Sequence, residues 1–170
     1  PMPKITFLSG SVPLTKSFAL GPDNTLIKYP YPHLANFTSE TLEIKSIKEL
    51  FAALLPQAQT GACLLKGAIQ RPLVEESRAG STSSGTPTKW ICYDLDGAPF
   101  KTPQEFLDTI GMGNISYVVQ YSASAGMPGS LGLSCHIFQF LSRELPAPQL
   151  KAWLTYLNLH TPALTAAITL

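Results

Sequence analysis

The sequence predicts an α+β fold in a single domain over residues 1–170, a mixed or antiparallel sheet with flanking helices. Apolar runs typical of strands and segments with the apolar spacing of helices both occur, but strands and helices do not alternate regularly along the chain. Two of these runs are joined by the glycine-containing loop AGMPGSLG (125–132), which has hairpin character. The chain is 45% hydrophobic and 14% charged, and 170 residues suffice for one sizeable core.

Five runs rich in apolar, β-branched and aromatic residues are expected to form strands. The glycines and prolines between residues 10 and 22 predict turns instead. YPYPHL (29–34) is expected to be irregular, because proline lacks an N–H and restricts the residue before it. The Ser-, Thr- and Gly-rich stretch 71–88 is expected to be a long loop, either disordered or functional. The predicted strands are KITFL (4–8), GACLLKGAI (61–69), WICYDL (90–95), SYVVQYSAS (116–124) and LSCHIFQFLS (133–142).

Three helices are predicted from apolar spacing and capping residues. The first two open with a hydroxyl residue three positions before a glutamate, a capping box, and the third places leucines and a tryptophan on one face. We expect Pro56 to end or bend the first helix and Gly111 to end the second. The predicted helices are SIKELFAALLPQ (46–57), TPQEFLDTIG (102–111) and PAPQLKAWLTYLN (146–158).

The composition narrows the class of protein. A net charge of +1 gives no field that steers the whole molecule to nucleic acid or a membrane. Nucleic-acid contacts would need a local basic patch, for which the candidates are Lys66, Arg71, Arg78 and Lys89. No apolar run reaches the about 20 residues of a membrane-spanning helix, so no membrane partner is expected. Three cysteines without Cys-x-x-Cys spacing are expected to be reduced, packed thiols of a cytoplasmic protein.

The first candidate catalytic residues are Asp94 and Asp96 in KWICYDLDGAPF (89–100). Residues two apart on a strand share a face, so the two carboxylates can share one partner. Like charges this close raise each other's proton affinity unless a cation compensates, and adjacent carboxylates suit Mg²⁺ or Mn²⁺. Gly97 would let the chain turn directly afterwards. The pattern favours a metal site at a strand end, and a plain Asp-Gly turn is the alternative.

The second candidate is Ser134-Cys135-His136 in another strand-like run. Alternation places Ser134 and His136 on one face and Cys135 on the other. The histidine is either functional or a satisfied core residue. Weaker candidates for phosphate binding are Ser122 and Ser124 in YSASAG, Lys66 at the end of its strand, and Arg78, whose guanidinium suits bidentate phosphate binding.

The Asp-x-Asp motif after an apolar strand, followed by YSASAGMPGSLGLSCHIF (121–138) with its Ser-x-His, resembles the archaeo-eukaryotic primase superfamily. More narrowly, it resembles the primase-polymerase type of plasmids, phages and mobile elements. The resemblance covers about residues 60–158. It implies an RRM-like catalytic core that performs DNA-directed nucleotidyl transfer with Mg²⁺ or Mn²⁺, in the cytoplasm, on a single-stranded DNA template.

The resemblance also implies roles for individual residues. Asp94 and Asp96 would be metal ligands, and His136, helped by Ser134, would contact the incoming nucleotide. Nucleotide triphosphates and the template strand are the implied partners, with helicase or replication-initiator regions further along a longer chain. Further nucleotide, phosphate or template contacts would come from Ser122, Ser124, Lys66, Arg71 and Arg78.

One element of the family pattern is missing. The family's third motif is an acidic residue downstream of the Ser-x-His strand, which completes the metal site. After His136 the only acid is Glu144 in SRELPAP, too close to that strand and in a loop-like setting. Together with the apolar ending TPALTAAITL (161–170), this favours a catalytic core truncated at its C-terminus, which would bind metal poorly and be inactive alone.

Two other interpretations stay open. The haloacid-dehalogenase phosphatases also carry Asp-x-Asp-Gly after an apolar strand, with Asp94 then the nucleophile and Asp96 the general acid. Against this, Ala98 stands where that family usually has Thr or Ser, and about ninety residues precede the motif. The third interpretation is a replication-initiator or regulatory fragment that binds nucleic acid or protein without catalysis.

Overall fold

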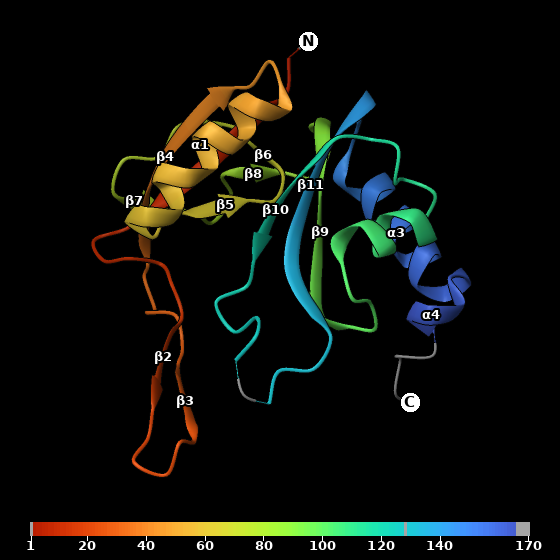
Figure 1. Ribbon diagram of the computed structural model, residues 1–170. Coiled ribbons are helices and arrows are strands. Elements are labelled where there is room, and N and C mark those ends of the chain that lie inside the picture. Colours follow the sequence, from red (N-terminus) through yellow and green to blue (C-terminus); the bar gives the residue numbers. More distant parts are fainter. Residues whose placement is uncertain (1, 128, 166–170) are drawn as a thin grey trace.

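The computed structural model describes residues 2–127 and 129–165, and within them two antiparallel sheets lie against each other (Figure 1). The first sheet has the strand order β5-β1-β4-β7, and the second has the order β10-β11-β9. The first consists of β1 (Lys4–Ser9), β4 (Asn36–Glu43), β5 (Cys63–Leu65) and β7 (Glu76–Ser77). The second consists of β9 (Thr88–Ala98), β10 (Tyr117–Tyr121) and β11 (Leu133–Leu145).

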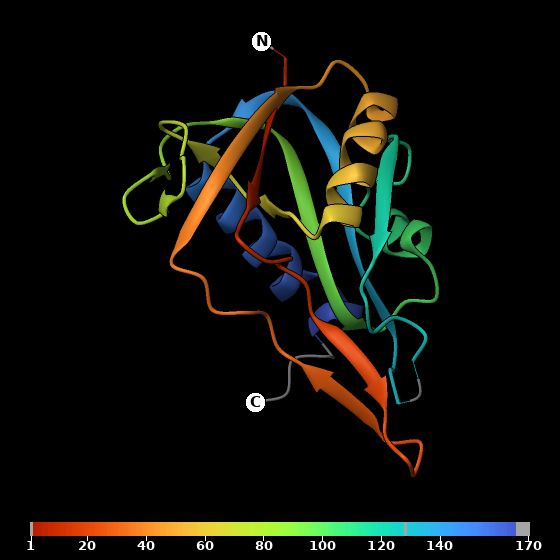
Figure 2. The ribbon, with the colours of Figure 1, turned by 90° about the vertical axis from the view of Figure 1, so that its left-hand side faces the viewer.

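Four helices and two small hairpin-like pairs complete the described chain. Strands β2 (Ser17–Leu20) and β3 (Leu26–Tyr29) pair only with each other, as do β6 (Ala68–Ile69) and β8 (Thr82–Ser83), within the described ranges. Helix α1 (Ile47–Thr60) lies near the first sheet, and α2, α3 and α4 lie on the outer side of the second (Figures 1 and 2). These last three are Pro103–Thr109, Ala147–His160 and Pro162–Thr165.

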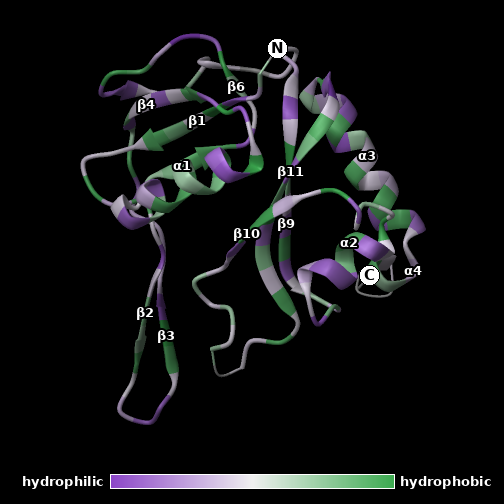
Figure 3. Cartoon of the chain, turned by 45° about the horizontal axis from the view of Figure 1, so that its top comes forward, coloured by the Kyte–Doolittle hydropathy of each residue, from purple (hydrophilic) through white to green (hydrophobic). Residues whose placement is uncertain are grey.

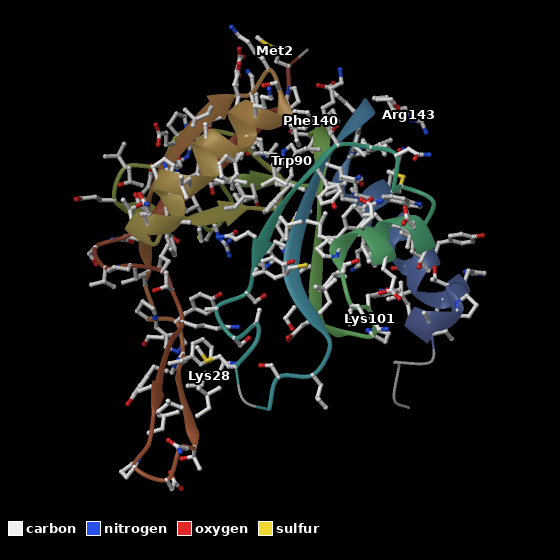
Figure 4. The ribbon with its side chains drawn as sticks, in the orientation of Figure 1. Met2, Lys28, Trp90, Lys101, Phe140 and Arg143 are labelled. Carbon is white, nitrogen blue, oxygen red and sulfur yellow. The ribbon has the colours of Figure 1, made fainter. Side chains whose placement is uncertain are left out.

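Alternation along β9 separates two cores. Ile91, Tyr93 and Leu95 face α2 and α3, where they pack with Phe106 and Leu107. On the other face, Trp90 packs with Phe138 of β11 and with Ile5 and Phe7 of β1, and the apolar face of α1 closes this second core. Figure 4 labels Trp90 and Phe140 at the end of the sheet nearer α1. Toward its other end, the same face of β9 carries Asp94 and Asp96, which are exposed.

The α+β class and the antiparallel pairing are confirmed. The hairpin between residues 117 and 145 forms as β10 and β11, and each capping box forms at its helix. Glu49 N–H donates to Ser46 Oγ at 3.2 Å, and Glu105 N–H donates to Thr102 Oγ at 3.1 Å. No helix of the described ranges is long and apolar enough to cross a membrane.

Several boundaries were wrong. The turn-rich stretch after Gly10 contains β2 and β3, and β4 was not predicted. Pro56 does not end α1, because the burial of Leu50 and Leu54 holds the helix together until Gly61, at φ 72°, caps it. The predicted strand 61–69 is divided into β5 and β6 by Gly67, whose φ of 146° breaks the extended run.

Candidate functional site

The structure brings Asp94 and His136 together on the exposed part of the second sheet. Asp94 on β9 and His136 on β11 are directly opposite each other in the antiparallel ladder. His136 Nε2 lies 3.1 Å from Asp94 Oδ1. The two motifs singled out in the sequence are therefore parts of one constellation, with Phe138 and Cys92 forming the next, apolar pair along the same face.

Lys66 reaches this constellation from the first sheet. It follows β5 directly and precedes Gly67, so its side chain leaves the sheet at the point where the strand ends. Lys66 Nζ donates to Asp94 Oδ2 at 2.6 Å. Each carboxylate oxygen of Asp94 thus has a partner, and each partner comes from a different sheet.

The electrostatics follow from these contacts. Partial burial raises the pKa of Asp94, but the hydrogen bond and positive charge of Lys66, together with His136, outweigh it, so that the pKa is lowered. Burial lowers the pKa of His136, an effect that Lys66 and Lys16 reinforce and that Asp94 only partly opposes. The lowered pKa favours the neutral imidazole. Its proton belongs on Nε2, facing the carboxylate, which leaves Nδ1 as an acceptor.

Asp96 lies in a β-bulge of β9, whereas the predicted strand ended at Leu95. Leu95 pairs with Cys135 and Ala98 pairs with Leu133, so Ser134 alone lies opposite both Asp96 and Gly97. Strand β9 continues through the bulge because Gly97, at φ 67°, adopts the left-handed conformation there. The turn predicted directly after Asp96 was wrong for this reason.

Ser134 holds the bulge. It is 6% exposed, and its Oγ accepts a hydrogen bond from the Gly97 N–H at 2.9 Å. The Ser134 carbonyl also accepts from the N–H of Ser122, where the loop between β10 and β11 begins. Ser134 thereby fixes the backbone that presents Asp96 and lies next to His136.

Ser122 and Ser124 lie in the loop 122–132 at the same end of the second sheet, because β10 ends at Tyr121. Ser122 is tied to β11 through its amide, and the Ser124 carbonyl accepts from Ser130 Oγ at 2.6 Å. Both side chains are half-buried. They remain candidates for nucleotide contacts, placed near the Asp96 end of β9.

The structure does not bring Arg71 and Arg78 to Asp94. Arg71 forms a bidentate pair with Glu76, at 2.6 and 2.7 Å. Arg78 lies close enough to Cys63 for its charge to oppose the burial that raises the pKa of that thiol. Cys63 packs with the core on the far face of the first sheet, away from Lys66.

Two neighbours of the constellation were missed in the sequence. Gln120 of β10 is the cross-strand partner of His136, so Gln120, His136 and Asp94 form a row across all three strands. Lys16, just before β2, is near enough for its charge to lower the pKa of His136. Only the β10–β11 register could have revealed Gln120, and no sequence signal connects Lys16 to this face.

The donor set fits a metal ion only in part. Asp94 and Asp96 offer carboxylate oxygens, and Mg²⁺ is often bound by one or two carboxylates with phosphates and water supplying the rest. Among the described residues, however, no group of three or more His, Cys, Asp or Glu side chains is arranged to hold a metal. Glu144 lies on β11, not in a loop, and close to the Thr88 end of β9, far from Asp94 in the ladder.

The chain matches none of the protein-family models, curated proteins or solved structures with which it was compared. The assignment of function therefore depends on the motifs and on the geometry of this site.

Proposed function

We propose that this chain is the catalytic core of a primase-polymerase, a DNA-directed nucleotidyltransferase that uses Mg²⁺ or Mn²⁺ on a single-stranded template. The observation that carries the proposal is the meeting of the two family motifs. Asp94 of the Asp-x-Asp motif and His136 of the Ser-x-His motif are cross-strand neighbours, with 3.1 Å between Nε2 and Oδ1. Spacing in the sequence alone does not require this contact.

The side chains suit the proposed chemistry. Asp94 and Asp96 would hold the metal, which supplies charge neutralisation and alignment for the attack of a 3′-hydroxyl on a triphosphate. Lys66 is an ammonium at the same carboxylate and is half-exposed, so it can contact a phosphate. His136 orients Asp94 through Nε2 and keeps Nδ1 available to a nucleotide.

The testing experiment measures nucleotide binding and incorporation together. A fluorescent deoxynucleotide triphosphate is titrated into the chain with Mn²⁺, with Mg²⁺ and with excess chelator, and incorporation is followed on a primed single-stranded template. Binding that needs the metal, and that is lost in Asp94→Asn and Asp96→Asn, supports the proposal. Asp108→Asn is the matched control, because Asp108 is exposed on α2 and its side chain contacts Gln104.

Two outcomes would contradict the proposal. Hydrolysis of an aryl phosphate that is abolished by Asp94→Asn would indicate the phosphatase. Nucleic-acid binding that is the same in both variants and in chelator, with no metal-dependent nucleotide binding, would indicate a module that binds without catalysis.

A further inference from the structure

The β2–β3 hairpin projects from the body of the protein. It is a two-stranded sheet with Ser17 opposite Tyr29 and Leu20 opposite Leu26, and in the described part of the chain it pairs with neither large sheet. Figures 1 and 2 both show it extending beyond the first sheet, beside the described residues of the loop between β10 and β11, 122–127 and 129–132. An isolated hairpin is marginally stable in water, so an arm of this kind gains from a partner.

The exposed side chains of this arm are largely apolar. Leu20 is 63% exposed, Ile27 is 40% exposed, and Tyr29 and Tyr31 are each 50% exposed. Figure 3 shows hydrophobic colour on part of each strand of the projecting hairpin. Large apolar side chains gathered on one protruding element indicate an interaction surface.

The charged residues of the arm are mostly basic, which indicates an anionic partner. Lys16 lies over the ring of Tyr31, with Nζ 5.1 Å from the centroid, and Lys28 is opposite Phe18 in the hairpin ladder (Lys28 is labelled in Figure 4). The only acid between residues 11 and 39 is Asp23. Its carboxylate is turned to the hairpin tip, where Thr25 Oγ1 donates to it at 2.6 Å. An element that carries both basic and aromatic side chains suits unpaired nucleotides, since phosphates meet cations and bases stack on rings.

The arm is also next to the candidate site. Lys16 stands at its base, because it directly precedes β2. The adjoining loop 122–132 leads directly into β11, which carries Ser134 and His136. A nucleic-acid strand bound along the hairpin toward its base would therefore approach the end of the second sheet that carries Ser134 and His136.

We propose that the β2–β3 hairpin is a binding arm for single-stranded nucleic acid, with bases stacked on Tyr29 and Tyr31 and phosphates held by Lys16 and Lys28. The surface is argued from its own residues, and the identity of the partner rests on the proposed function. Unpaired bases are favoured over a duplex because stacking on tyrosine needs a base whose face is free.

The test measures binding of a fluorescein-labelled oligo-dT of about 16 nucleotides, without metal or nucleotide. The double variant Tyr29→Ala/Tyr31→Ala is expected to bind about tenfold more weakly or worse, and Tyr29→Phe/Tyr31→Phe is expected to bind as the unchanged protein does. Lys16→Ala and Lys28→Ala should each flatten the salt dependence, by a slope of about 0.7. The matched controls are Tyr156→Ala and Lys151→Ala, exposed residues of α3.

The outcomes separate this inference from the proposed function. An equal loss of oligo-dT binding in the α3 controls, or no loss in the hairpin variants, would refute the proposed binding arm, whether or not the chain incorporates nucleotides. Hairpin-dependent binding together with hydrolysis of an aryl phosphate that Asp94→Asn abolishes would support the arm and count against the polymerase. Self-association that is lost in the tyrosine double variant, with oligo-dT binding unchanged, would assign the surface to a second copy of the chain and overturn the inference.

Discussion

Replacing Ser134 by alanine tests whether this residue holds the bulge or contacts the nucleotide directly. Its Oγ lies 2.9 Å from the Gly97 nitrogen, and the residue is 6% exposed. Losing a hydrogen bond of this kind costs about 1 kcal/mol, and up to about 3 kcal/mol when the donor left behind is fully buried. Gly97 is itself exposed, so water can reach its N–H and the lower figure applies. For a chain of this size we expect Tm to fall by about 2–4 °C.

The assay is thermal unfolding of Ser134→Ala beside Ser142→Ala. Ser142 is exposed on the same strand, and its replacement should change stability by less than about 0.5 kcal/mol. Equal stability of the two variants would refute the reasoning that the hydroxyl fixes the bulge. Nucleotide binding that weakens in Ser134→Ala without any loss of stability would instead assign Ser134 the direct contact that the family resemblance implies.

Two further predictions concern the same end of the second sheet. Gly132→Ala should lower the free energy of unfolding by at least about 2 kcal/mol more than Gly126→Ala does. Both glycines have a φ of 74°, but of these two only Gly132 would bring its new Cβ against backbone, 2.5 Å from the Ala98 carbonyl oxygen. Equal thermal stability of the two variants would contradict this. Lys66→Met should raise the pKa of His136 in an NMR titration, because a nearby positive charge is removed. The folded-state pKa of His136 is depressed, so the stability that this histidine contributes is present above about pH 6.5 and declines as the pH falls toward the folded-state pKa. Lys66→Met should therefore make this decline smaller. A His136 pKa that falls in Lys66→Met would contradict the reasoning.

Local signals predicted the helices and the central hairpin well. Ser46 with Glu49, and Thr102 with Glu105, form their capping boxes as the pattern indicates, since a cap involves only neighbouring residues. Alternation also placed Ser134 and His136 on one face of β11 and Cys135 on the other; in the structure Cys135 is fully enclosed and His136 is partly open. Properties that depend on a few adjacent residues are thus accessible without a structure.

Longer-range pairing was not accessible. β4 has the mixed sequence NFTSETLE, and its strand character depends on pairing with β1, whose residues lie far earlier in the chain. The hairpin β2–β3 was hidden by Pro13, Gly21 and Pro22, although two of these residues belong to its turn. In the site, Lys66 was a candidate because of its type and position, but its contact with Asp94 requires the first sheet to meet the second.

The two adjacent carboxylates raised the question of which cation compensates them. The structure gives part of the answer from within the chain: the ammonium of Lys66 lies 2.6 Å from Asp94 Oδ2, while the bulge places Asp96 opposite Ser134. Their repulsion is therefore reduced before any metal binds, and the low pKa of Asp94 keeps that carboxylate ionised. A metal at Asp94 has to compete with Lys66. The proposed function thus requires the ammonium to exchange the carboxylate for a phosphate when a nucleotide arrives, which connects metal binding to nucleotide binding through a single side chain.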